Sequence, residues 1–107
     1  MKTTKPKMYR QGDVLLVSAS APANLKAVPA QAGRNILAYG EVTGHHHSVD
    51  AACSHAFVDD AGVTWLECLE AVALLHQEHA PIELPVGWYR KVQQVEYTPE
   101  AVRNVAD

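Results

Sequence analysis

Glycine and proline breaks constrain the fold of this 107-residue chain more than any other feature of its sequence. The apolar runs between the breaks are short, and a glycine within a helix costs about 1 kcal/mol relative to alanine. Residues 12–20, GDVLLVSAS, have the composition of a strand that follows a turn. Residues 35–49, NILAYGEVTGHHHSV, contain Gly40 and Gly44, which predict a strand, a bend and a second strand. The chain is therefore expected to be mainly β.

Three further segments bear on the arrangement of the strands. Residues 59–62, DDAG, separate AFV from VTW and predict a hairpin turn. Residues 87–97, GWYRKVQQVEY, predict a strand with large side chains on both faces. Residues 21–35 are rich in Pro, Gly, Asn and Ala, and they predict a loop. From this pattern we expect a small β-barrel or β-sandwich.

The segment TWLECLEAVALLHQEH, residues 64–79, has two interpretations. Its apolar residues follow the i, i+3, i+4, i+7 spacing of an amphipathic helix. The prolines at positions 81 and 85 and the strands expected on either side favour an extended chain, and we predict strands here. At the other end of the domain, Thr98, Pro99 and Glu100 supply an N-cap, a first-turn proline and a first-turn acid. They predict a short C-terminal helix.

The length of the chain predicts one domain, because 107 residues can bury one core. Residues 1–10 contain four basic residues and no acid, so we expect a basic N-terminal arm followed by a single β-rich domain over residues 11–107. No apolar run approaches the roughly 20 residues that span a bilayer, and the N-terminus lacks the apolar segment of a signal peptide. A cytoplasmic protein without a membrane partner is expected. Cys53 and Cys68 are expected to be free thiols.

The charge of the chain is unevenly distributed around a net charge of -3. Residues 35–89 contain no Lys or Arg, yet they hold eight acidic residues and all six histidines. Such a segment suits a cation, whereas a surface that binds nucleic acid needs basic side chains. We therefore expect a cation rather than nucleic acid as the partner of the central region.

Two histidine clusters are the candidate metal ligands. In a strand, His45 and His47 would point to the same face about 7 Å apart, with His46 on the opposite face. His76 and His79 form the second cluster and could lie beside the first across a sheet. Two or three imidazoles with a carboxylate are a typical site for one divalent transition metal, here Zn²⁺, Fe²⁺, Mn²⁺ or Ni²⁺, and the spacing does not choose between these ions.

Glu41 and Glu78 are candidates to orient the imidazoles, to bind the metal or to act as a base. His76 and His79 would lie on opposite faces of a straight strand, so they can bind together only where the chain bends, as Pro81 permits. HQEH is not the HExxH motif of zinc proteases. We expect Asp13 to be a turn former and His55 to be an ordinary surface or core histidine. The chain contains no GxGxxG, GxxxxGK[ST] or GxSxG motif.

Four segments resemble a family of small, mostly uncharacterised proteins from bacteria and their phages: YRQGDVLL, LAYGEVTGHHH, HQEHAPIELPVGWYR and QQVEYTP. The shared patterns are GEVTGHxH and HxEHxPIxLPxGxY. The resemblance implies that His45, His47, His76, Glu78 and His79 belong to the family pattern, and it implies no reaction. A looser similarity to the cupins lies in HHH and the later Pro85-Val86-Gly87 turn. It implies a cupin-like barrel, although His76 and His79 precede this turn rather than follow it.

Two classes of function remain open from the sequence. The first is a metal-binding β domain of phage-associated type, either an enzyme with a metal-bound water and Glu78 or Glu41 as base, or a structural module whose metal is saturated by protein ligands. The alternative is a metal-independent interaction module that assembles as a homo-oligomer. The strand over residues 87–97 predicts self-association in either case, because its large side chains on both faces need cover. No small-molecule substrate is indicated.

Overall fold

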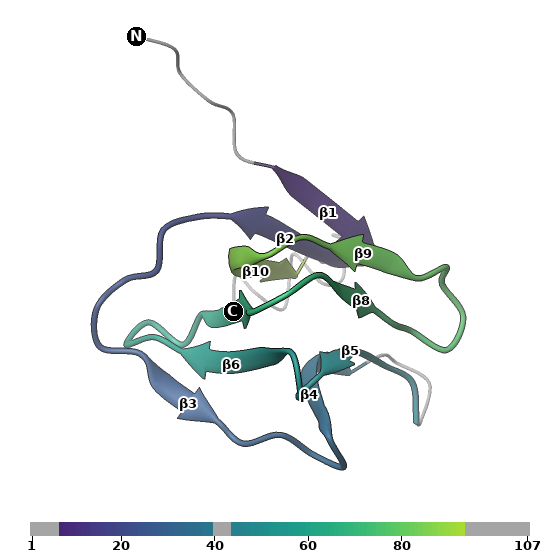
Figure 1. Ribbon diagram of the computed structural model, residues 1–107, viewed down its shortest axis with the longest axis horizontal. Helices are drawn as coiled ribbons and strands as arrows, with labels where there is room; N and C mark the ends of the chain where they lie inside the picture. Colours follow the sequence, from purple (N-terminus) through teal and green to yellow (C-terminus); the bar gives the residue numbers. More distant parts are fainter. Residues whose placement is uncertain (1–6, 40–43, 94–107) are drawn as a thin grey trace, which may run out of the picture.

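The computed structural model describes residues 7–39 and 44–93, which form three antiparallel sheets (Figure 1). The largest has six strands in the order β1-β2-β10-β7-β6-β3. Its strands are β1 (Met8–Gln11), β2 (Val14–Ser18), β10 (Gly87–Gln93), β7 (Thr64–Cys68), β6 (Ser54–Val58) and β3 (Lys26–Val28). The described residues contain no helix, and hence none that could cross a membrane.

Two short hairpins complete the fold. One pairs β4 (Arg34–Tyr39) with β5 (His46–Asp50), and the other pairs β8 (Val72–Leu74) with β9 (Ile82–Leu84). A bridge between Ser48 and Leu75 joins the two hairpins. The hairpins therefore lie side by side (Figure 1), and residues of both contribute to the core that packs against the large sheet.

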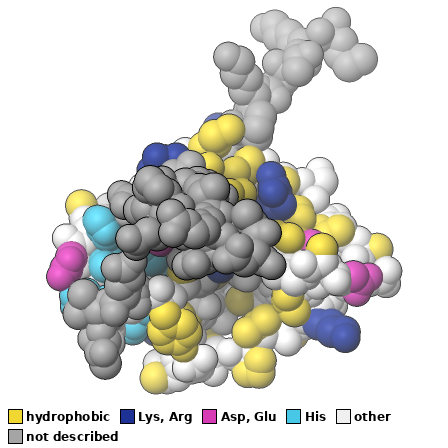
Figure 2. Space-filling model, turned by 180° about the vertical axis from the view of Figure 1, so that it is seen from behind, with side chains coloured by type: hydrophobic (Ala, Val, Ile, Leu, Met, Phe, Trp, Pro, Cys, Tyr) yellow, Lys and Arg dark blue, Asp and Glu magenta, His cyan; other side chains and the backbone are white. Residues whose placement is uncertain are grey.

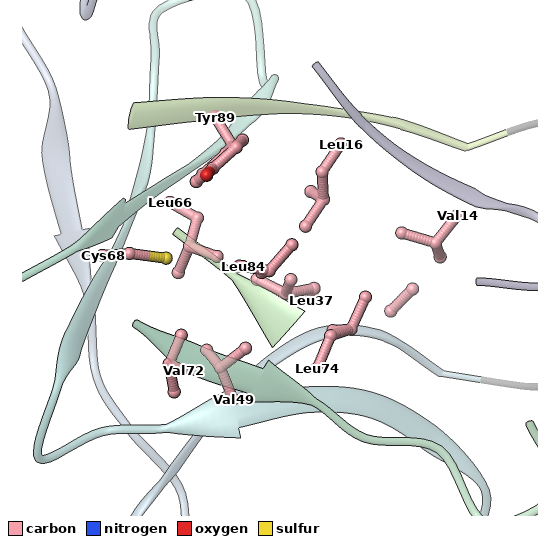
Figure 3. Packing of buried hydrophobic residues seen from close by; sticks show 11 residues of the cluster. Val14, Leu16, Leu37, Val49, Leu66, Cys68, Val72, Leu74, Leu84 and Tyr89 are labelled. Carbon is pink, nitrogen blue, oxygen red and sulfur yellow. The ribbon is translucent and has the colours of Figure 1, made fainter. Parts of the chain in front are cut away.

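The hydrophobic core lies between the large sheet and the two hairpins (Figure 3). Alternate residues of the sheet point into it, and each hairpin strand adds one or two side chains. Burying each large aliphatic side chain stabilises the fold by about 1.5–3 kcal/mol. The buried members are Val14, Leu16, Leu37, Ala38, Val49, Leu66, Cys68, Val72, Leu74, Leu84 and Tyr89.

The structure confirms the main sequence predictions. The segment over residues 64–79 is extended, because β7 and β8 lie within it. The turn between β6 and β7 is fixed by Asp59, whose carboxylate accepts hydrogen bonds from the backbone of Ala61 and Val63 and from the indole of Trp65. These bonds stabilise the charged form and lower the pKa of Asp59.

Other expectations fail or fall outside the described residues. The closed or cupin-like barrel is wrong, since β1 and β3 are the two unjoined edges of the large sheet in the described chain. The loop predicted over residues 21–35 contains the edge strand β3. Residues 8–10 of the expected basic arm belong to β1, whereas residues 1–6 lie outside the described part. The C-terminal helix expected from residue 98 onward also lies outside it.

Candidate metal centre

Four histidines from separate parts of the sequence gather in one cluster. His45 immediately precedes β5 and His47 lies at its start, whereas His76 and His79 come from the connection between β8 and β9. The ring centroid of His76 lies 4.4 Å from that of His47, 4.7 Å from that of His79 and 5.6 Å from that of His45. The rings of His47 and His79 are stacked at 6.1 Å. Figure 2 shows histidine side chains gathered at one side of the molecule.

The backbone brings the two histidine segments together. The N–H of Ser48 donates to the carbonyl of Leu75 at 3.0 Å, and the N–H of Leu75 donates to the carbonyl of Ser48 at 2.9 Å. This bridge places the preceding His47 beside the following His76. The backbone N–H of His46 also donates to Oε1 of Gln77 at 2.7 Å. The cluster therefore depends on the contact between the hairpins.

Gln11, a buried residue at the end of β1, fixes the orientation of His47. Its Nε2 donates to the carbonyls of Leu74 and Ala80, each at 2.9 Å, so both amide hydrogens are used. Its Oε1 lies 2.9 Å from Nδ1 of His47. Because a carbonyl can only accept, the amide cannot turn over, and Nδ1 of His47 must donate to Oε1. The neutral imidazole then presents its lone pair at Nε2.

Gln11 also holds the segment that carries the other two histidines. Leu74 and Ala80 lie on either side of His76 and His79 in the chain. One side chain from β1 thus anchors both ends of this segment and orients His47 at the same time. Among the described residues, no buried side-chain nitrogen or oxygen lacks a hydrogen-bond partner.

The electrostatic surroundings favour neutral imidazoles at the centre of the cluster. His47 is 2% exposed, and this burial, followed by the neighbouring His76, lowers its pKa below the usual 6.5, although Asp13 acts in the opposite direction. The pKa of His76 is also lowered, first by burial and then by His79 and His45. Neutral imidazole is the form that binds a metal ion.

Two carboxylates lie at the rim of the cluster. Oδ1 of Asp13 is 3.5 Å from Nε2 of His47, and Oε1 of Glu78 is 3.6 Å from Nδ1 of His45. Both side chains are more than half exposed. Each carboxylate oxygen is at about the separation of two atoms that share one ion in tetrahedral geometry, which is roughly 3.4 Å for bonds of about 2.1 Å.

Gly12 provides the space in which His79 lies. Gly12 has a φ of 60°, and a Cβ added there would lie 2.7 Å from Nε2 of His79. The turn between β1 and β2 is thus in contact with the imidazole ring. Only a residue without a side chain allows this approach at a left-handed backbone conformation.

The donor atoms do not converge on one point in the structure. Among residues 7–39 and 44–93, no group of three or more His, Cys, Asp or Glu side chains is arranged to hold a metal ion. His76 shows one reason, because its Nδ1 accepts a hydrogen bond from the backbone N–H of Glu78 at 3.0 Å. Its proton is then on Nε2. Side chains must rotate before the cluster can bind an ion, and His79 is exposed while His45 and His76 are half-buried.

The remaining predicted residues lie elsewhere. The ring of His46 contacts Tyr39 at 6.4 Å, and exposed His55 lies near Phe57 at 6.3 Å. Glu41 lies outside the described residues. Cys53 and Cys68 are free thiols, as expected.

Sequence reasoning missed Gln11 and Gly12 and treated Asp13 only as a turn former. Their signal was the QGD triplet, which stands in the first of the four family-like segments. A turn that follows a strand reveals its conformation in the sequence, but it does not reveal which distant side chains it will meet.

The chain belongs to the family described as a domain of unknown function, DUF8820, whose model matches residues 10–94. The matched range includes the four clustered histidines together with Gln11, Gly12, Asp13 and Glu78. No curated protein and no solved structure matches the chain.

Proposed function

We propose that this protein binds one divalent transition-metal ion through His45, His47, His76 and His79. The observation that carries the proposal is the orientation of the buried Gln11, whose side-chain amide is fixed by its hydrogen bonds to Leu74 and Ala80. Its Oε1 accepts the Nδ1 proton of His47, so the lone pair on Nε2 of His47 points away from the Gln11 amide. A metal-ligating histidine is typically held in this way by a hydrogen bond to its other ring nitrogen. Gln11 therefore has the role expected of a group that orients a ligand.

The ring positions support the same proposal. Imidazoles that share an ion through bonds of 2.0–2.1 Å have centroids roughly 5 Å apart. The observed separations from 4.4 to 6.1 Å lie around this value. His47 is the anchored ligand, and the less buried His45, His76 and His79 complete the site by rotating their side chains. In His76 this rotation exchanges the hydrogen bond from Glu78 N–H for a bond to the ion.

The carboxylates bear on what the ion does. Asp13 and Glu78 are within reach of an ion at the cluster, and either one could accept a proton from a metal-bound water in an enzyme. A structural site would instead have all its positions filled by protein ligands. Nitrogen donors with a carboxylate suit Zn²⁺, Fe²⁺, Mn²⁺ or Ni²⁺. Glu41 keeps its place as an alternative base, and a bacterial or phage setting and a cytoplasmic location belong to the same proposal.

Metal analysis of the purified chain tests this function. We expect about one ion per chain after equilibration with Zn²⁺, a rise in melting temperature on loading and a fall on chelation. His47→Ala should lose most of the affinity in a calorimetric titration. His46→Ala is the matched control, because its ring packs against Tyr39 and not against the cluster. A chain whose melting temperature ignores both Zn²⁺ and EDTA contradicts the proposal.

A second candidate function is a metal-independent interaction module, in which the histidines form a polar network. The observation that favours it is that one ring nitrogen of each central histidine already has a hydrogen-bond partner, Oε1 of Gln11 for His47 and the backbone N–H of Glu78 for His76. The same titration separates the two functions, because a polar network predicts no saturable binding. Co²⁺ adds a second measurement: its visible spectrum reports tetrahedral nitrogen coordination, and a change on addition of azide reports an exchangeable position.

A further inference from the structure

The six-stranded sheet has a second apolar face, which points away from the core. Residues of the core cluster alternate along each strand with residues of opposite orientation. In β2, for example, Val14 and Leu16 are in the core, so Leu15 and Val17 point outward. We call this surface the outer face. Its large apolar side chains are Met8, Leu15, Val17, Phe57, Trp65, Trp88 and Val92.

The outer face has the composition of an interface. Solvated faces of antiparallel sheets are usually polar, and a strand that is apolar at every position is usually covered on both sides. The run VLLV of β2 is such a strand. Phe57 and Trp88 contact each other with ring centroids 5.3 Å apart. Trp65 is buried within one copy, so a partner would cover the half-buried side chains and Met8, which is 60% exposed. Both hairpins lie on the core side, so the described residues supply no second layer here.

We propose that a second copy of this chain covers the outer face, which makes the protein a homodimer with face-to-face sheets. Six strands about 4.8 Å apart and three to seven residues long give a face of roughly 400 Å² in projection. The accessible area of such a corrugated surface is larger, and the dimer reaches about 600–800 Å² per partner, the range of transient to standard interfaces. Two sheets packed in this way form an aligned β-sandwich.

The distribution of side chains on the outer face is complementary to itself. One half, formed by β1, β2 and β10, carries Arg10 and Arg90 together with the apolar side chains Met8, Leu15, Val17, Trp88 and Val92. The other half, formed by β7, β6 and β3, carries Glu67 and His55 with Phe57 and Trp65. A two-fold axis parallel to the strands and between β10 and β7 lays each half on the opposite half of the partner. Arg90 of each copy then faces the half of the partner that carries Glu67, and the apolar side chains of the two halves pack against each other.

The geometry predicts one specific pair across the interface. Arg90 is paired with Trp65 in the register of β10 and β7, and Trp88 is paired with Glu67. The two-fold axis exchanges β10 with β7, so Arg90 of one copy lies over the partner's β7, two residues from the level of Glu67. The length of an arginine side chain covers this step. The axis generates the same pair twice.

A charge-exchange experiment tests the dimer and its location. Light scattering of the full chain at micromolar concentration should give twice the chain mass of 11.7 kDa. Arg90→Glu and Glu67→Arg should each weaken the dimer at least tenfold, because each homodimer then contains two like-charged pairs. An equimolar mixture of the two variants should regain the dimer, because both pairs are again opposite in charge. No rearrangement within one chain gives this result.

Matched variants keep the experiment interpretable. Glu83→Arg makes the same charge change as Glu67→Arg at the exposed residue of β9 and should leave the dimer intact. Val17→Glu should also give monomers, whereas Tyr39→Glu, at a position 62% exposed on the hairpin of β4 and β5, should not. Circular dichroism checks that each variant is folded, and the charge variants remain informative if Val17→Glu fails to fold.

Two results overturn the proposal. A wild-type monomer shows that the face is covered by another part of the same chain or left open. A dimer that persists in both charge variants, or a mixture that stays monomeric, shows that the interface is elsewhere. The metal proposal is untouched by either result, since the histidine cluster lies on the core side of the sheet.

Discussion

Replacement of Gln11 by leucine removes one side chain and three hydrogen bonds from the structure. Leucine has a similar size and no polar atom, so Nδ1 of His47 and the carbonyls of Leu74 and Ala80 all lose their contact with residue 11. A hydrogen bond contributes about 1 kcal/mol net, and a buried group left without a partner costs about 1–3 kcal/mol. We expect the free energy of unfolding to fall by about 3 kcal/mol. For a domain of this size that corresponds to a loss of about 12–24 °C in melting temperature.

The assay for Gln11→Leu is thermal and urea denaturation followed by circular dichroism, with Gln31→Leu as control. Oε1 of Gln31 accepts a hydrogen bond from the exposed Tyr39 hydroxyl at 3.2 Å, so its loss should change the free energy of unfolding by less than about 0.5 kcal/mol. Nitrogen NMR gives a second readout, because His47 of the wild type should carry its proton on Nδ1. A Gln11→Leu variant as stable as the control, or a wild-type His47 protonated on Nε2, would refute the reasoning.

Three further predictions use other contacts. Gly12→Ala should displace His79 and weaken Zn²⁺ binding, whereas Gly33→Ala, with φ of 77° and no atom within 4 Å of the added Cβ, should cost only the backbone strain and leave Zn²⁺ affinity unchanged. Because the pKa of His47 is lowered in the folded state, the unfolded chain takes up this proton at a higher pH than the folded chain does. The free energy of unfolding of the metal-free protein should therefore be fully retained above about pH 6.5 and should decrease as the pH falls through the folded pKa. The same dependence of unfolding free energy on pH in His47→Gln would contradict this. Glu70→Gln should speed alkylation of Cys53, because the hydrogen bond to Glu70 raises the pKa of that thiol, while buried Cys68, with a pKa of about 11, should stay unreactive in both proteins, as mass spectrometry can check.

The strands could be predicted where turn-forming residues in the sequence mark their ends. The hairpin at Asp59 was visible because the turn residues and their flanking β-formers are adjacent in the chain. The edge strand β3 was not visible, because all three of its residues are exposed and its only signal is the pairing with β6. The sequence also does not distinguish a closed barrel from an open sheet, since closure depends on whether two edge strands meet. Local patterns do not contain that information.

The candidate site was also predictable only in part. The gathering of His45, His47, His76 and His79 was expected from their spacing and from the lack of basic residues around them. The part played by Gln11 was hidden, because a glutamine in a strand is unremarkable until its three partners are known. Lys91 is a similar case: its Nζ donates to the carbonyl of Leu37, at the irregular pairing of β4 with β5, and its burial lowers its pKa. The sequence around Lys91 indicated only that the strand predicted over residues 87–97 has no purely apolar face.

The four histidines differ in how well they are prepared for a metal ion, and the difference follows from what each ring already contacts. His47 is buried and held by Gln11, so little rotational freedom remains to be lost when it binds. His76 must release the Glu78 N–H, and the exposed His79 must be ordered, at a cost of about 0.5–1.5 kcal/mol for each immobilised side chain. We therefore expect the affinity of the proposed site to be set mainly by the ligands that must be reoriented or ordered. Substitution of Gln11 should lower it further, because Gln11 fixes the one ligand that needs no rearrangement and holds both ends of the segment that supplies two others.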